Sequence, residues 1–173
     1  MIVVSDSGPL MALGKTGGLG ALFRLFPSIL TPPAVYEEAV TAGLRLGAPD
    51  ALLLREHYQA GVLTVKTSAG SSLPLPSPLG PGEEESVLLA IEHRANWLLV
   101  DDLDARRAAV VNFAAAGVET RVKGTLGIIL SAHQAGSLSR EEAVGIVTAL
   151  SRRPDIWISP SLCTRVLAEL ETG

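Results

Sequence analysis

The sequence predicts an α/β fold, a three-layer α/β/α sandwich with a central, mainly parallel sheet, and three observations lead to it. Strand-like segments alternate with helix-like segments, and the strand-like segments are short and almost wholly apolar. Such strands are typical of parallel sheets that helices cover on both faces. The length of 173 residues and the hydrophobic content of 47% suit one domain with a full core, so we expect a single domain over 1–173.

The first half of the chain contains three expected strands. Residues 2–5 are apolar and β-branched, and the small and capping residues after them are typical of a helix start. Pro33 suits the first turn of a helix. In order, we expect a strand at 2–5, a helix at 7–15, a strand at 26–31, a helix at 34–44, a helix at 51–60, a strand at 62–65 and a Pro/Ser/Gly loop at 68–82 that is the mobile segment of the chain.

The second half continues the alternation. Acidic residues in a first turn, followed by Val87, Leu88 and Ile91 at helical spacing, predict a helix with one buried face. Gly117 is a candidate C-cap, because glycine readily adopts the left-handed conformation that ends many helices. In order, we expect a helix at 83–95, a strand at 97–100, a helix at 104–117, a strand at 118–122, helices at 124–136 and 140–153, and further helical sequence up to 171.

Net charge narrows the function classes only partly. The chain has 18 acidic and 14 basic residues and a net charge of −4, which counts against nucleic-acid binding by the surface as a whole. A cluster of metal-binding carboxylates would also lower the formal charge, while its bound cations would restore positive charge locally. The total charge therefore does not exclude a nucleic-acid substrate.

The cysteine content and the N-terminal segment indicate a location. Cys163 is the single cysteine, so we expect neither an intramolecular disulfide framework nor a cysteine zinc cluster, which suits a reducing compartment. The apolar start meets Asp6 before it could form a signal-peptide core, and no uncharged run approaches about 20 residues. We expect a cytoplasmic protein without a membrane-spanning segment.

Acidic residues gather where strands end. Asp6 follows the strand at 2–5 directly, and Asp101 follows the strand at 97–100 directly. In open α/β sheets ligands bind beyond the carboxyl ends of the strands, near the point where the strand order reverses. If these two strands are neighbours, the two carboxylates can reach one cation. Further acids lie at the starts of nearby helices: Glu37, Glu38, Glu83, Glu84, Glu85, Asp102 and Asp104.

Each of these residues also has an ordinary structural interpretation. Short polar side chains cap helices, and acids in a first turn are favoured by the helix dipole. Dispersed histidines without ligand spacing and a cysteine without a base partner are more often structural than catalytic. These interpretations cover Asp6 or Ser7 as a helix cap, Asp102 or Asp104 as a cap, residues 83–85 as a first turn, Glu37 and Glu38 as a solvated face, and His57, His93, His133 and Cys163 as structural residues.

Five motifs in order resemble one known family. They are SDSGPLMAL, PPAVYEEAV, GEEESVLLA, LLVDDLDARR and KGTLGIIL, and the resemblance extends from Val3 to about Ile129. This arrangement resembles the PIN-domain superfamily, in particular its prokaryotic VapC-like branch. The resemblance implies a PIN-like fold, three or four acidic residues that hold Mg²⁺ or Mn²⁺, and endonucleolytic hydrolysis of phosphodiester bonds, usually in RNA.

The resemblance also assigns roles to residues. The first acid corresponds to Asp6 and the second to Glu38, and the third falls on Glu85, where the family usually has Asp followed by Ala and this chain has Glu85-Ser86. The fourth falls on Asp101 or Asp102, with Asp104 behind them. VapC-like relatives act as toxins that pair with an antitoxin protein, and they commonly form homodimers, so both partners are expected from the resemblance.

Physical chemistry explains why such acids would gather. Crowded carboxylates raise one another's pKa, but a divalent cation reverses the sign of the interaction. Oxygen ligands without His or Cys favour Mg²⁺ or Mn²⁺ over zinc. Candidate phosphate contacts are Lys15, Arg106 and Arg107, with the Arg121 and Lys123 pair beside them, although arginine pairs on helices commonly form a solvated face.

Two other functions fit parts of the pattern. A PIN-like module that binds protein or nucleic acid without turnover agrees with the acidic net charge and the lack of an evident basic groove. Idle clustered carboxylates would destabilise such a module unless something paired them. A phosphoacceptor domain of the response-regulator type also gathers acids at strand ends, but its acid pair follows the first strand, whereas here the pair falls late. We therefore expect the nuclease first, the module second and the phosphoacceptor last.

Overall fold

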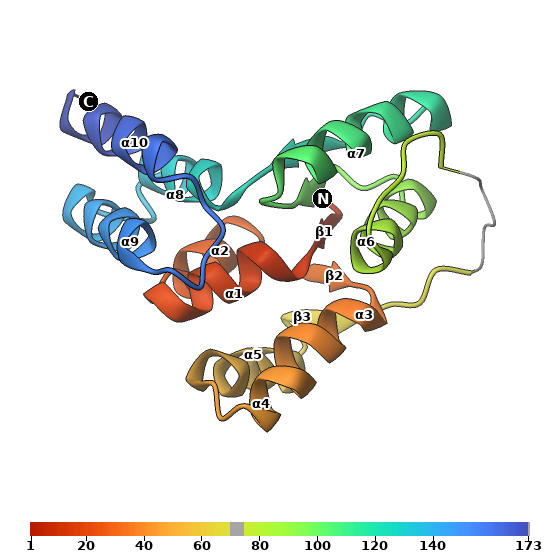
Figure 1. Ribbon diagram of the computed structural model, residues 1–173, viewed down its shortest axis with the longest axis horizontal. Helices are drawn as coiled ribbons and strands as arrows, with labels where there is room; N and C mark the ends of the chain where they lie inside the picture. Colours follow the sequence, from red (N-terminus) through yellow and green to blue (C-terminus); the bar gives the residue numbers. More distant parts are fainter. Residues whose placement is uncertain (70–74, 173) are drawn as a thin grey trace.

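A five-stranded parallel sheet forms the centre of the computed structural model, which describes residues 1–69 and 75–172 (Figure 1). The part of the expected mobile loop at residues 70–74 lies outside the described residues. The strands are β1 (Val3–Ser5), β2 (Ile29–Thr31), β3 (Leu63–Val65), β4 (Trp97–Leu99) and β5 (Arg121–Lys123).

The strand order is β3-β2-β1-β4-β5, and every neighbouring pair is parallel. The chain runs outward from β1 through β2 to β3, then returns to the other side of β1 for β4 and β5. The order therefore reverses between β1 and β4, which is the position where sheets of this kind bind ligands. Ser5 pairs with Leu99 in this register, so both strands end at the same level.

Helices connect consecutive strands and continue beyond the last one. In the described part of the chain they are α1 (Ser7–Thr16), α2 (Leu19–Leu25), α3 (Pro33–Tyr36), the π-helical η1 (Glu37–Ala42), α4 (Gly43–Arg45), α5 (Pro49–Gln59), α6 (Pro81–Glu92), α7 (Leu103–Ala116), α8 (Thr125–Gln134), α9 (Arg140–Arg152) and α10 (Pro160–Thr172). None of the helices in the described part is both long and apolar enough to cross a lipid bilayer.

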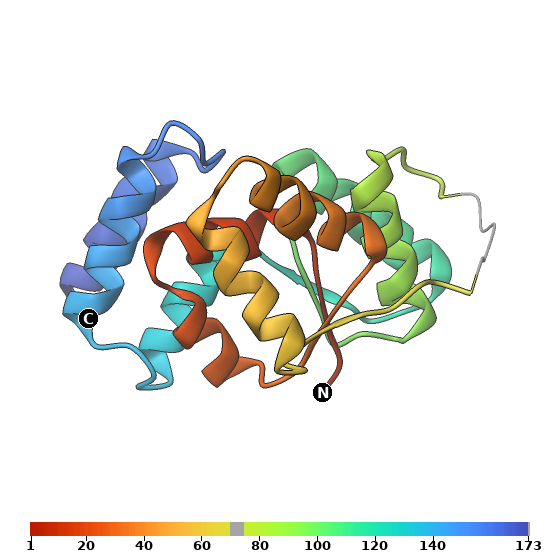
Figure 2. The same cartoon turned by 90° about the horizontal axis from the view of Figure 1, so that it is seen from below.

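The helices cover both faces of the sheet, because successive strand side chains point to opposite faces. Val3 and Leu99 enter the larger core, which α1, α2, α5 and α8 to α10 complete. Val4 and Leu98 enter the smaller core, which α6 and α7 complete. Figure 1 shows α6 and α7 on one side of the strands and α1, α2 and α8 on the other, and Figure 2 shows α9 and α10 at the end of the molecule far from α6. This arrangement confirms the predicted three-layer α/β/α fold.

Several boundaries differ from the predictions. The strand predicted at 26–31 begins only at Ile29, whose backbone amide donates to the carbonyl of Val62. Pro27, two residues earlier, has no amide hydrogen and cannot form such a bond. The strand predicted at 118–122 begins at Arg121, because the amide of Val118 donates to Phe113 and closes the end of α7 behind the left-handed Gly117. Helix α2 was not predicted, since its seven residues are too few to show a clear period.

Candidate active site

Asp6 and Asp101 lie on either side of the point where the strand order reverses. Asp6 follows β1, and its backbone amide donates to the carbonyl of Leu99, the last residue of β4, at 2.9 Å. Asp101 lies two residues beyond Leu99. The sheet register therefore brings two residues that are 95 positions apart in the sequence to the same edge, as the sequence predicted for neighbouring strands.

A pocket of about 370 Å³ lies at this edge. It is bordered by one side of α1 along its length, by η1, by the start of α6, by the segment after β4 and by the loop between α9 and α10. Its acidic lining residues are Asp6, Glu38, Glu83, Asp101, Asp102 and Asp155, and Lys15 is the basic residue of the lining. Four of the predicted site residues, Asp6, Glu38, Asp101 and Asp102, thus share one pocket.

The side chain of Asp6 is not used as a helix cap. Asp6 occupies the N-cap position of α1 but forms no capping hydrogen bond from its side chain. The hydroxyl of Ser86 lies 3.4 Å from its Oδ1. Burial raises the pKa of Asp6 to about 6, the charges of Glu38 and Glu83 add to the rise, and the backbone of Ser7 and the Ser86 hydroxyl oppose it. Asp6 is therefore a half-buried carboxyl whose ionisation is disfavoured mainly by burial and further by its acidic neighbours.

Asp101 is held rigidly by the start of α8. Its Oδ1 accepts from the backbone amide of Thr125 at 2.7 Å, and its Oδ2 accepts from the Thr125 hydroxyl at 2.6 Å. Burial raises the pKa of Asp101, while these hydrogen bonds and the charge of Arg106 oppose the rise. A Cβ atom at Gly124 would lie 3.0 Å from Asp101 Oδ1. Glycine at position 124 therefore leaves the room that this carboxylate needs.

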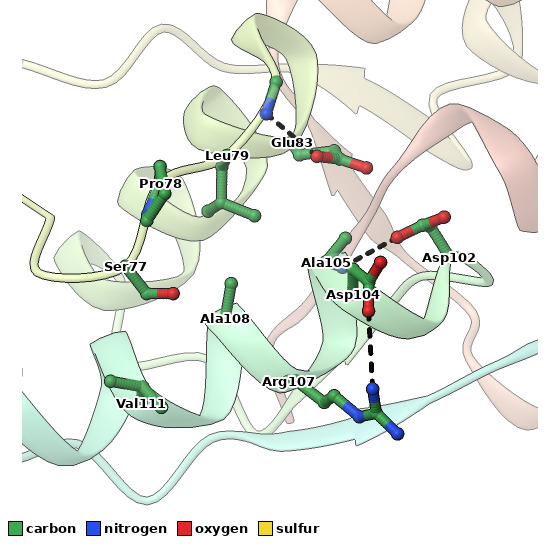
Figure 3. A pocket seen from close by; sticks show the side chains of 11 residues that line it. Ser77, Pro78, Leu79, Glu83, Asp102, Asp104, Ala105, Arg107, Ala108 and Val111 are labelled. Atoms are coloured by element: carbon green, nitrogen blue, oxygen red, sulfur yellow. Dashed lines mark hydrogen bonds and ion pairs between the residues drawn. The ribbon is translucent and has the colours of Figure 1, made fainter.

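Asp102 and Glu83 have structural tasks as well as places in the pocket. Asp102 is the N-cap of α7, and its Oδ1 accepts from the amide of Ala105 at 2.7 Å, so this part of the capping interpretation is confirmed. Glu83 Oε2 accepts from the amide of Gly80 at 2.9 Å at the start of α6. Both residues also line a second hollow of about 400 Å³ between α6 and α7, where Leu79 and Ala108 lie between the two helices (Figure 3).

Glu38 is exposed and lies on η1. It lines the acid pocket, and within the described residues its side chain forms no hydrogen bond or ion pair, whereas its neighbour Glu37 pairs with Arg45 at 3.5 Å. Its place in the lining of the acid pocket, which Glu37 does not share, distinguishes Glu38 from a residue that belongs only to a solvated helix face.

Glu85 and Asp104 lie outside the acid pocket. Glu85 Oε2 accepts from the amide of Ala34 at 3.1 Å and lines a separate hollow beside Pro32 and Pro33. The Asp104 side chain is 91% exposed and pairs with Arg107 at 3.4 Å. Because residues two apart on a helix face different directions, α6 turns Glu83 toward Asp6 and Glu85 toward α3. Glu83 belongs to the acids predicted near the strand ends, but the motif assigns the third acid to Glu85, and helical geometry is the signal that separates the two glutamates.

The basic residues are dispersed. Lys15 Nζ pairs with Asp155 at 2.9 Å and is nearly buried, so its charge is already neutralised. Arg106 is half-buried beside Asp101, and Arg107 is exposed on the rim of the second hollow.

Arg121 and Lys123 contact an aromatic ring outside the acid pocket. Both cationic groups lie over the ring of Trp97, at 4.2 and 4.5 Å from its centre. The ammonium of Lys123 also contacts Ser131. Arg121 begins β5 beside Trp97, and Lys123 ends β5 beside Leu99, but neither residue lines the acid pocket.

The loop between α9 and α10 contributes residues that were not predicted for the site. Asp155, Ile156, Trp157 and Ile158 line the acid pocket beside the start of α1. No spacing in the sequence links them to the acidic motifs, because the contact depends on how the C-terminal helices pack on α1. The sequence signal for Trp157 is an aromatic residue in the short segment between two helical patterns.

The donor chemistry of the pocket suits a hard cation, since all the acidic side chains offer carboxylate oxygens. Among residues 1–69 and 75–172, no three His, Cys, Asp or Glu side chains are already grouped so that they could hold one metal ion. Burial raises the pKa of Asp6, and the charges of Glu38 and Glu83 add to the rise, so a cation at this place would offset the cost of ionising Asp6.

Fold and site together define a three-layer α/β/α protein with an acidic pocket at the switch point of a parallel sheet. The chain belongs to the PIN-domain superfamily: a family model for the PIN domain matches residues 2–172. This is a fold of the nuclease type. No curated protein and no solved structure matched the sequence.

Proposed function

We propose that the protein is a metal-dependent endoribonuclease that hydrolyses phosphodiester bonds of RNA in the acid pocket. The observation that carries the proposal is the convergence of Asp6 and Asp101 from the ends of neighbouring parallel strands, with Glu38 and Glu83 facing them in one pocket. Membership of the PIN-domain superfamily supports the same class of reaction.

The residues proposed to hold Mg²⁺ or Mn²⁺ are Asp6, Glu38 and Asp101, with Glu83 and Asp102 next. When bound, such an ion lowers the pKa of a water molecule and stabilises charge on the attacking and leaving oxygens at phosphorus. Glu83 replaces Glu85 in this set, because Glu83 lines the pocket and Glu85 does not.

The chain itself supplies position and electrostatics. Thr125 holds both oxygens of Asp101, so this carboxylate presents a fixed orientation. Asp6 has a pKa of about 6 in the absence of a cation, which places its ionisation close to neutral pH. A positive charge in the pocket would favour the ionised form of Asp6.

The test is cleavage of a mixed pool of single-stranded RNA with Mn²⁺ or Mg²⁺ and with chelator. We expect Asp6→Asn and Asp101→Asn to lower the rate at least about 100-fold, because each removes a negative charge that would hold the metal ion. Glu83→Gln should also lower the rate, and Glu85→Gln is the matched control on the same helix. Equal rates for wild type, Asp6→Asn and Asp101→Asn would sink the nuclease proposal, and a loss confined to Glu85→Gln would return the third acid to Glu85.

A binding module without turnover is the second candidate, and a specific observation favours it. Asp101, Asp102 and Glu83 all have structural partners, in Thr125, Ala105 and Gly80, so these acids do not need a reaction to explain them. Mn²⁺ binding measured by calorimetry would then be lost in Asp6→Asn, while no RNA is cleaved by the wild type. That pair of results would establish the module in place of the nuclease.

The partners of the VapC-like branch are part of the proposal. We propose that the nuclease is the toxin of a toxin–antitoxin pair and that it forms a homodimer. Growth arrest on expression, relieved by a co-expressed antitoxin, tests the first point. Sedimentation velocity over a range of concentrations tests the second.

A further inference from the structure

Trp157 lies in water at the rim of the acid pocket. Its side chain is 97% exposed, although indole is among the largest apolar groups in proteins. It lines the pocket together with Ile156 and Ile158, in the loop between α9 and α10. An exposed aromatic residue beside a candidate catalytic pocket needs a physical reason.

The exposure is not a consequence of a loose loop. Ile156 and Ile158 are half-buried and pack against the larger core, so the residue between them is directed outward. The carboxylate of Asp155 accepts from Lys15 Nζ of α1 at 2.9 Å and from Arg153 Nε and Nη2 at 3.0 and 2.9 Å. These contacts attach the loop to the helix that Asp6 precedes, so Trp157 has a defined place relative to the acids.

Trp157 also borders a cationic hollow. This further pocket, of about 530 Å³, is separate from the hollow between α6 and α7, and its lining includes Trp157, Arg152 and Arg153. Arg153 is paired with Asp155, whereas Arg152 is exposed and forms no ion pair within the described residues. An aromatic face beside a free guanidinium is the combination with which proteins bind single-stranded nucleic acid, through base stacking and phosphate contacts.

We propose that Trp157 is a stacking platform for a nucleobase of single-stranded RNA whose backbone passes the acid pocket, with Arg152 contacting a neighbouring phosphate. This inference rests on the proposed function and names how the substrate is held. A chain of net charge −4 gains little affinity for RNA from its overall electrostatic field. A contact that does not depend on charge can supply affinity in its place. Stacking on an aromatic ring is such a contact, and it tolerates any base.

The first measurement is affinity for a fluorescently labelled single-stranded RNA, with chelator present to prevent cleavage. We expect Trp157→Ala to weaken binding about 5- to 150-fold, which corresponds to the loss of one stacked base, and Trp157→Phe to keep most of the affinity. Leu46→Ala, at another highly exposed apolar residue, is the matched control and should bind as the wild type does. An oligomer of the same length with abasic sites should bind wild type and Trp157→Ala equally.

The second measurement uses the fluorescence of the indole itself. The chain has two tryptophans, so Trp97→Phe leaves Trp157 as the single tryptophan, and excitation at a wavelength that tyrosine does not absorb reports on it alone. Single-stranded RNA should quench the fluorescence of Trp157, and the abasic oligomer should leave it unchanged.

Three outcomes separate this inference from the nuclease proposal. Unchanged RNA affinity in Trp157→Ala overturns the stacking role, even if the wild type cleaves RNA. A variant that changes self-association and leaves RNA affinity intact overturns it too, and assigns Trp157 to a protein interface. If the wild type cleaves no RNA but Trp157→Ala still loses affinity for bases, the stacking role stands and the nuclease proposal fails.

Discussion

Burial beside Glu38 and Glu83 raises the pKa of Asp6 to about 6 in the folded chain, from an ordinary value of 3.8. Between these two pH values the folded state holds a proton that the unfolded state releases. The free energy of unfolding therefore decreases as the pH rises through this window, and the full penalty is present above pH 6. At the scale of one residue, the free energy of unfolding is lower at neutral pH because the folded chain holds an ionised Asp6 in a buried, acidic pocket.

Asp6→Asn should remove that penalty. In chelator at pH 7 we expect the variant to exceed the wild type in free energy of unfolding by roughly 1–3 kcal/mol, since a shift of one pKa unit corresponds to about 1.4 kcal/mol. The two proteins should converge near pH 4. Urea denaturation at several pH values measures this, with Asp104→Asn as the control because that side chain is 91% exposed. If Asp6→Asn kept the wild-type dependence of unfolding free energy on pH, the raised pKa of Asp6 would be contradicted.

Helix α7 shows how one residue can serve an element and a site together. Asp102 caps the helix through its hydrogen bond with Ala105 and also lines the acid pocket. The two roles differ chemically, because a cap needs an oxygen acceptor and a cation site needs a negative charge.

Substitution can separate these two roles. Asp102→Ala should lower the free energy of unfolding by about 1 kcal/mol, whereas Asp102→Asn should lower it by less, because asparagine also caps helices well. Both variants should lose affinity for Mn²⁺ if the charge contributes to the cation site. Thermal unfolding in chelator and calorimetric titration with Mn²⁺ give the two readings. Equal destabilisation by both substitutions would mean that the charge, and not the cap, stabilises α7.

At the scale of the whole molecule, the C-terminal helices complete the pocket through the loop between α9 and α10. Lys15 and Asp155 are 140 positions apart, yet their 2.9 Å ion pair joins α1 to this loop. Hydrogen bonds from Arg153 and Lys15 hold the pKa of Asp155 well below its usual range. Lys15 therefore positions the loop and does not offer the free charge that a phosphate contact requires.

Lys15→Met should loosen the loop with little effect on global stability. We expect a change in the free energy of unfolding below about 1 kcal/mol, because Asp155 is 45% exposed and water screens the pair. Amide hydrogen exchange should become faster at residues 153–159 and stay the same in β1 and β4. Lys66→Met, at an exposed lysine without an ion pair in the described residues, is the control. Unchanged exchange in the loop would show that Ile156 and Ile158 hold it without the ion pair.

The layer architecture and most elements could be predicted from periodicity, because short apolar runs and helical spacing are local signals. Boundaries depended on details such as the missing amide hydrogen of Pro27 and the closure of α7 by Val118. For the site, the strand-end rule indicated Asp6 and Asp101 correctly as neighbours at one edge. The motif favoured Glu85 over Glu83, because a motif records position along the chain and not the direction in which a helix turns each side chain.

The sequence by itself determined which residues end the strands, since hydrophobic pattern and capping residues act over a few positions. Tertiary structure decided which of these residues meet. The pairing of β1 with β4 brings Asp6 to Asp101, the turn of α6 directs Glu83 into the pocket, and the packing of α9 on α1 adds Trp157. Such contacts depend on how faces of different elements fit together, and no single stretch of the chain records that.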